Sequence, residues 1–262
     1  MSSNLTLSAN EFQCGYEEEN EFQLEENVMR NSSETVEVVV MVGYYASELG
    51  VEITKKDGSK IPSLYGDGHH VWWGSQNYPG RIPTGLWTAY RTQAAQIIWA
   101  CCDSYLSDGM CEAEYMQKYA IDRFDILQTD FPRLFDSAGW FRSKNDFESW
   151  IRDISVFDKK SSTTRTVMEE VIKIINEKFG DRTINIHFVT SANHASRVLR
   201  DAAAAFYEGV ILNKDGTSRN VAERLRGSAM VNVVVAKTSY GEGNPIRTVV
   251  YDNGTESYRS WV

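Results

Sequence analysis

The chain has 262 residues, of which 42% are hydrophobic and 24% charged, and its formal net charge is −9. This length is sufficient for one domain with a full hydrophobic core. The negative charge argues against nucleic-acid binding through a broad basic face. The sequence has neither a run of eighteen apolar residues nor a basic, apolar leader, so we expect a cytoplasmic protein with no membrane partner.

The first 35 residues are polar and acidic. Glutamates gather between Glu11 and Glu26, and Arg30 is the only basic residue of this segment. Such a segment is either a solvated arm or a helical arm that docks on a neighbouring molecule. We therefore predict an acidic N-terminal arm over residues 1–35 and a single domain with helical insertions over residues 36–262.

The first part of that domain combines apolar strands with a long segment rich in glycine and proline. Val36–Tyr45 is predicted to be a strand, and Val51–Thr54 its hairpin partner or a neighbouring strand. Gly58–Thr92 is predicted to be a long irregular loop. Tryptophan is enriched in protein interfaces, so we expect the tryptophans of this loop to be buried in subunit contacts or against the domain, and not to line an open catalytic cleft. They are Trp72, Trp73 and Trp87.

The second part contains clearer periodic patterns. Apolar residues recur at helical spacing in Thr164–Phe179, with Gly180 at the end, and again after Ser191, with Gly209 at the end. Ser191 or Asn193 is expected to cap the second of these helices. Ala94–Cys101 is predicted to be a strand or a helix, and Cys111–Trp150 is predicted to be helical with a break at Pro132. Three further strands are predicted, at Ile184–Val189, Met230–Ala236 and Ile246–Tyr251. Strands and helices do not alternate regularly, so the sequence predicts an α+β fold.

Three short pieces of the chain, in this order, resemble the polyhedrins of cypoviruses. They are Tyr44-Tyr45 at the end of an apolar strand, Gln96-Ile97-Ile98 in a later strand, and Ser191-Ala192-Asn193-His194 at the start of a long helix. The resemblance implies a capsid-like antiparallel β-sandwich with added helices. It also implies a structural protein without catalytic activity, which self-assembles into the crystalline matrix of viral occlusion bodies.

Further expectations follow from this resemblance. The partners would be copies of the chain and the virus particles that they enclose, in the cytoplasm of the infected host cell. The matrix would protect virions and dissolve at alkaline pH, where tyrosines ionise, and Tyr44 and Tyr45 are the candidate pH sensors. Trp72, Trp73 and Trp87 are the candidate assembly residues. No cofactor would be required, although polyhedrin crystals can trap nucleotides between subunits.

The residues also permit two other kinds of function. Asp67-Gly68-His69-His70 is the best metal candidate, but adjacent histidines rarely bind one ion and no third ligand lies nearby. A cytoplasmic hydrolase or transferase centred on the Asp67–His70 loop is therefore the alternative function. Cys101, Cys102 or Cys111 could act as a nucleophile with His187 or His194, a pairing that residue counts alone do not support. The last alternative is a ligand-binding sandwich without catalysis.

Overall fold

The structure is a computed structural model, and the residues that it describes lie in one compact unit of the chain, residues 34–262. It describes residues 35–43, 53–55, 60–61, 72–75, 78–100, 104–106, 110–135, 140–213, 215–236, 247–252 and 255–260. Apart from Thr35, the predicted N-terminal arm lies outside these residues. Among the described residues, no helix is long and apolar enough to cross a membrane.

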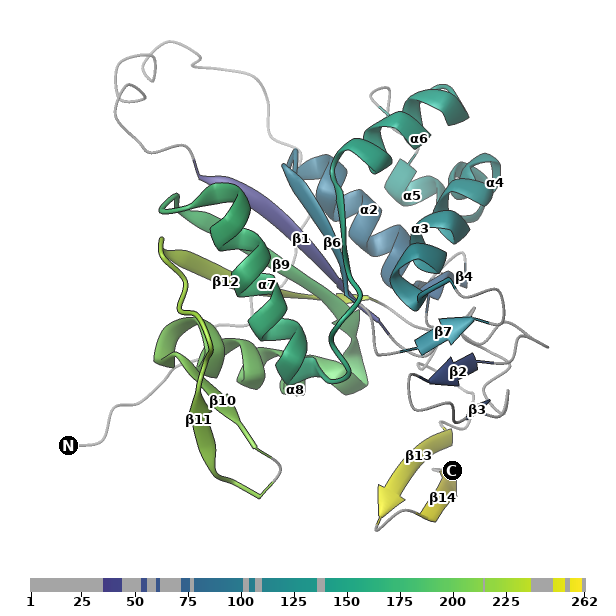
Figure 1. Cartoon of the computed structure of the whole chain (residues 1–262). Helices are drawn as coiled ribbons and strands as arrows, with labels where there is room; N and C mark the ends of the chain where they lie inside the picture. The colour runs from purple at the N-terminus through teal and green to yellow at the C-terminus, as the bar shows by residue number, and fades with distance from the viewer. Residues whose placement is uncertain are drawn as a thin grey trace, which may run out of the picture. The chain divides into compact units, whose positions relative to one another are not determined.

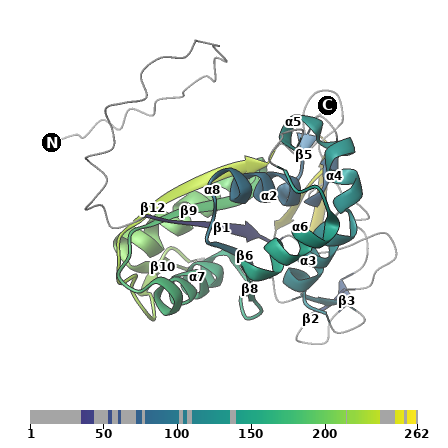
Figure 2. The same ribbon diagram turned by 90° about the horizontal axis from the view of Figure 1, so that it is seen from above.

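A single five-stranded parallel sheet forms the centre of the fold (Figures 1 and 2). Its order is β12-β9-β1-β6-β8, and every neighbouring pair is parallel. The strands are β1 (Val36–Val42), β6 (Gln96–Ala100), β8 (Ser155–Asp158), β9 (Ile184–Ser191) and β12 (Ala229–Ala236). The antiparallel β-sandwich predicted from the sequence, and with it the α+β class, is therefore wrong. The fold is α/β.

The apolar strand sequences explain why the sheet is parallel. Six of the seven residues of β1 are buried, and they alternate between two hydrophobic clusters, one on each face of the sheet. A strand that is apolar on both faces is typical of a parallel sheet covered by helices on both sides. An antiparallel sandwich needs only one apolar face on each strand.

Helices cover both faces of this sheet (Figure 1). One hydrophobic cluster includes residues of the helices α2 (Arg81–Arg91), α3 (Glu112–Asp122), α4 (Phe124–Asp130), α5 (Pro132–Phe135) and α6 (Lys144–Asp153). The other includes residues of α7 (Thr164–Phe179), α8 (Ala192–Ala203) and the π-helical turn η2 (Ala204–Glu208).

Short strands form small sheets of their own. β2 (Ile53–Lys55) lies between β3 (Lys60–Ile61) and β7 (Ser104–Leu106) in a separate sheet. It is therefore neither the hairpin partner nor a neighbouring strand of β1. The other small sheets are antiparallel pairs: β4 (Gly74–Ser75) with β5 (Tyr78–Pro79), β10 (Val210–Leu212) with β11 (Ser218–Asn220), and β13 (Arg247–Asp252) with β14 (Thr255–Ser260).

The long irregular loop predicted for Gly58–Thr92 is wrong in its last third, because α2 occupies Arg81–Arg91. Ile82, Leu86 and Ala89 are buried at helical spacing. Pro83 lies in the first turn, where proline is tolerated. Gly85 allows the helix to approach the sheet closely, since a Cβ atom there would lie 2.6 Å from Met41 Cε.

The two helices predicted from clear periodicity are confirmed. α7 has the bounds Thr164–Phe179, as predicted. α8 and η2 together extend to Glu208, and Gly209 follows with a left-handed φ of 69°.

Candidate functional site

The order of the strands indicates where a ligand would bind. From β1 the chain proceeds to β6 and β8 on one side, and it then crosses to β9 and β12 on the other. The direction of winding therefore reverses between β1 and β9. In open α/β sheets, ligands bind outside the carboxyl ends of the strands at such a reversal. We call the region at Val42, Gly43 and Ser191, where β1 and β9 end, the switch-point edge.

A buried arginine joins the two strand ends at this edge. Arg81 is the first residue of α2, and only 1% of its surface is exposed. Its Nη1 donates to the carbonyl oxygens of Val42 (2.6 Å) and Gly43 (2.8 Å), and its Nη2 donates to Ser191 Oγ (2.6 Å). Arginine is almost never buried to this extent unless its guanidinium group is paired. Arg81 therefore places a positive charge at the point where the sheet reverses.

The N-terminus of α8 adds to this positive charge. Ser191 occupies the N-cap position, but its side chain makes no capping hydrogen bond. Its Oγ accepts a hydrogen bond from Arg81 instead, which corrects the expectation that Ser191 caps the helix. The side chain of Asn193, the other expected cap, lies outside the described residues. The first-turn amides of α8 therefore lack a cap from Ser191, and such amides favour an anion.

His194 connects three elements at the same edge. One ring nitrogen, Nε2, lies 3.0 Å from Thr164 Oγ1 at the start of α7, and Nδ1 lies 3.3 Å from Thr190 Oγ1 in β9. Burial, followed by the charges of Arg81 and Arg197, lowers the pKa of His194 to about 3. The ring is therefore neutral at physiological pH, and it holds the first turns of α7 and α8 in place.

Two buried carboxylates lie at the neighbouring strand ends. Glu112 begins α3 and is fully buried, and its Oε1 would lie 3.0 Å from a Cβ atom on Gly43. Asp158 ends β8, next to Ala100 of β6, and is 1% exposed.

Asp158 has an asymmetric environment. Its Oδ1 accepts hydrogen bonds from the backbone amides of Lys160 and Ser161, each at 3.0 Å, whereas no described residue forms a hydrogen bond with its buried Oδ2. Burial is the main cause that raises the pKa of Asp158; the charge of Glu170 acts in the same direction, and hydrogen bonds from Ser161 and Lys160 oppose it.

Buried charge is concentrated at this edge of the sheet. Within the described part of the chain, the buried charged side chains are Arg81, Glu112, Asp158 and Asp201. The first three lie at the carboxyl end of a strand or in the first turn of a helix, and Asp201 does not. Burying a charge costs stability unless partners compensate it, and such groups gather at functional sites.

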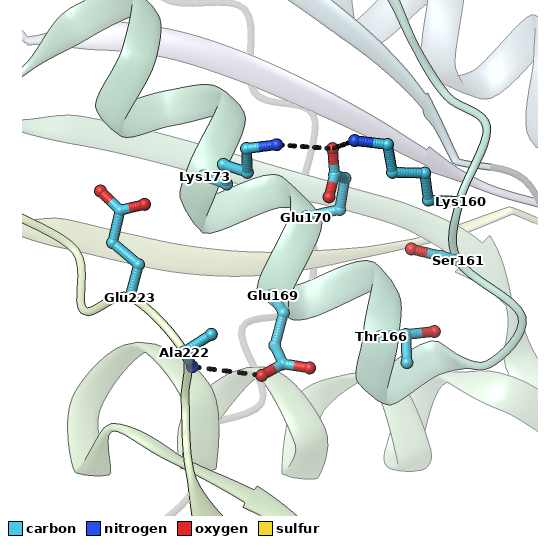
Figure 3. Close-up of a pocket in the computed structure, with 8 residues that line it drawn as sticks. All are labelled: Lys160, Ser161, Thr166, Glu169, Glu170, Lys173, Ala222 and Glu223. Atoms are coloured by element: carbon cyan, nitrogen blue, oxygen red, sulfur yellow. Dashed lines mark hydrogen bonds and ion pairs between the residues drawn. The ribbon is translucent and has the colours of Figure 1, made fainter.

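A hollow lies along α7 (Figure 3). It has a volume of about 280 Å³, and it is lined by Lys160, Ser161, Thr166, Glu169, Glu170, Lys173, Ala222 and Glu223. Its carboxylates already have partners within the chain. Glu169 pairs with Arg219, Glu223 with Arg226, and Glu170 lies between Lys160 and Lys173. Each of the three carboxylates of the hollow therefore has a cation of the chain beside it.

No family model, curated protein or solved structure matches this chain. The geometry of the described residues is therefore the basis for its candidate function.

The structure places some of the residues singled out in the sequence. Trp72 and Trp73 are buried in the cluster under α2 and α3, and Trp73 Nε1 donates to Asp130 Oδ2 at 2.7 Å. Trp87 is partly buried against the same cluster. Tyr44, Tyr45 and the Asp67–His70 loop lie outside the described residues.

The predicted cysteine and histidine pairs are only partly described. Cys101 and Cys102 lie outside the described residues, and Cys111 is buried at the N-cap position of α3. His187 lies 2.7 Å from Glu37, and His194 contacts two threonines. Among the described residues, no group of three or more His, Cys, Asp or Glu side chains could hold a metal ion.

Sequence reasoning singled out Ser191 and His194 but missed Arg81 and Asp158. Arg81 lies in the segment interpreted as a loop, and the apolar spacing of Ile82, Leu86 and Ala89 was the signal that could have revealed its helix. Asp158 ends a strand of only four residues. The hydroxyl-rich run Ser161–Thr164 that follows could have marked the loop between a strand end and a helix start.

Proposed function

We propose that this protein binds a small anionic molecule, carrying a phosphate or carboxylate group, at the switch-point edge. The observation that carries the proposal is the position of Arg81, which joins the ends of β1 and β9 beside the N-terminus of α8. The carboxyl ends of strands at a reversal in winding are the usual ligand site of open α/β sheets.

The positive groups at the start of α8 favour an anion there, although Glu112 and Asp158 lie at the neighbouring strand ends. Arg81 and the exposed Arg197 both act electrostatically on His194, so both lie near the start of α8. The helix N-terminus favours a negative group by about 0.3–1 kcal/mol, and a hydrogen bond to a charged group adds about 1.5–3 kcal/mol. Arg197 is the side chain that can reach a ligand from solvent, whereas Arg81 fixes the strand ends beneath it.

Calorimetric titration of the purified chain with inorganic phosphate, acetate and adenosine monophosphate tests this proposal. We expect at least one of these anions to bind, and we expect Arg197→Ala to weaken binding about tenfold or more. Lys178→Ala is the matched control, because Lys178 is an exposed cation in the last turn of α7, at the opposite end of that helix from the site. If no anion binds, or if both variants weaken binding equally, the proposal is wrong.

A hydrolase or transferase reaction on the bound anion is a second candidate. The buried Asp158, whose Oδ2 accepts no hydrogen bond from the described residues, favours it, since carboxyl groups with a raised pKa act as proton donors and acceptors in enzymes. This moves the enzyme hypothesis from the Asp67–His70 loop to the carboxyl end of β8, two strands from β1. Turnover of phosphate esters by the wild-type chain, lost in Asp158→Asn while ligand binding persists, would support it; absence of turnover would count against it.

Self-assembly into occlusion bodies remains a proposal with less support. The fold that the polyhedrin resemblance implies differs from the parallel sheet observed here. Light microscopy of cells that express the chain tests this function, because refractile polyhedral bodies would support it and a uniformly soluble protein would not.

A further inference from the structure

Strand β12 forms one edge of the main sheet (Figure 1). Its residues pair with β9 along one side. On the other side, the Val231 amide donates to Tyr207 Oη at 3.0 Å, so the backbone groups of Val231 point away from β9. Successive residues of a strand alternate in direction, so the backbone groups of Val233 and Val235 point outward as well.

Within the described part of the chain, this edge lacks the usual protection against pairing with another strand. Natural edge strands carry charged residues or proline, or are covered by another element. The eight residues Ala229–Ala236 include neither a charge nor a proline. Met230 is 56% exposed and Val235 is 44% exposed, and Tyr207 protects only the amide of Val231. The outward groups of Val233 and Val235 have no hydrogen bond among the described residues.

We propose that β12 pairs in antiparallel orientation with β12 of a second copy of this chain, so that two sheets join across a two-fold axis. The edge of an antiparallel strand is complementary to itself, as a two-fold contact requires. The net charge of −9 makes two copies repel each other, and a contact through β12 adds no local repulsion because this strand carries no charge. An uncharged strand also gives a charged partner protein no ion pair to recognise.

The position of Tyr207 limits the register of this pairing. Tyr207 occupies the Val231 amide, so the outward positions between it and the carboxyl end of β12 are Val233 and Val235. Val233 of one copy would then lie opposite Val235 of the other, with the two-fold axis at Val234. In this register the strands exchange backbone hydrogen bonds without displacing Tyr207.

Light scattering coupled to gel filtration, over a series of protein concentrations, tests the proposed dimer. We expect the wild-type chain to approach twice its monomer mass of 29.7 kDa as concentration rises. The double variant Met230→Lys/Val235→Lys should remain at the monomer mass, because it adds the charges that protect natural edge strands. Ile126→Lys is the matched control, since Ile126 is 41% exposed on α4 and should leave the dimer intact.

Hydrogen exchange shows directly whether a second copy of the chain pairs with the edge of β12. We expect the amides of Val233 and Val235 to exchange slowly in the dimer and quickly after dilution. A monomeric wild-type chain, or a dimer that persists in the folded double variant, would overturn the proposal. Slow exchange that dilution does not change would also overturn it, because another segment of the same chain would then cover β12.

Discussion

Arg81 Nη2 donates to Ser191 Oγ at 2.6 Å, although the two residues are 110 positions apart in the sequence. Through this contact the start of α2 is fixed to the end of β9, while Nη1 of the same arginine is fixed to the end of β1. One buried side chain therefore ties together the ends of the two strands on either side of the reversal. The shape of the switch-point edge depends on it.

Replacement of Arg81 should destabilise the fold. In Arg81→Met, Ser191 Oγ and the carbonyl groups of Val42 and Gly43 lose their donor, and we expect the free energy of unfolding to fall by about 2–4 kcal/mol. Arg91→Met, at the exposed end of the same helix, should cost about 1 kcal/mol or less, since Arg91 lies over the Trp87 ring at the surface. Urea unfolding measures both values, and equal losses would contradict the role of Arg81.

The His194 ring makes stability depend on pH. Its pKa is about 3 in the folded chain, below the ordinary value of 6.5, so the unfolded chain binds a proton more readily. The stability that this provides is present above pH 6.5 and is lost as pH falls toward 3. We expect the wild-type chain to lose more stability than His194→Gln between pH 7 and pH 4, as measured by urea unfolding. A parallel pH dependence in both proteins would contradict this account.

Asp158 should make stability depend on pH in the opposite direction from His194. Burial raises its pKa, so the neutral form is favoured in the folded chain, and its contribution to stability is lost as pH rises through the folded pKa. Asp158→Asn keeps an oxygen that can accept from the amides of Lys160 and Ser161, and it removes the ionisation. Relative to the wild type, this variant should gain stability as pH rises from 4 to 7 in thermal unfolding. A constant difference between the two proteins across this range would rule out the titration of Asp158.

Gly43 should not tolerate a side chain. A Cβ atom there would lie 2.5 Å from the carbonyl oxygen of Ala100 and 3.0 Å from Glu112 Oε1, so β1 and β6 would have to separate at their carboxyl ends. Overpacking of this kind costs about 1–3 kcal/mol. We expect Gly43→Ala to lower the unfolding free energy by this amount and to weaken anion binding. Wild-type stability and binding in Gly43→Ala would show that this edge can relax.

Elements with strong local patterns could be predicted from the sequence, whereas the sheet that arranges them could not. The apolar residues of α7 recur every three or four positions, and this spacing gave its bounds. In α2, Pro83 and Gly85 indicated a loop, although a first-turn proline and a glycine packed on Met41 are both compatible with a helix. Without α2, the crossover from β1 to β6 was not recognised, and the parallel sheet was missed.

The candidate site is harder to predict because it has no local pattern. Arg81, Glu112, Asp158 and His194 come from four different crossovers, and only the order of the strands brings them to one edge. A pair such as Arg81 and Ser191 leaves no signal in either segment by itself. Polyhedrin-like residues in three short segments likewise gave no information about the direction in which neighbouring strands run.

Nuclear magnetic resonance of the labelled chain, titrated separately with inorganic phosphate and with acetate, is the most direct test of anion binding at the switch-point edge. We predict saturable shifts at the backbone amides of Ala192, Asn193 and His194 and at the Arg197 side chain, with little change at Lys173 in the hollow along α7. Shifts centred on Lys160 and Lys173, or no saturable shift with either anion, would contradict the proposed site.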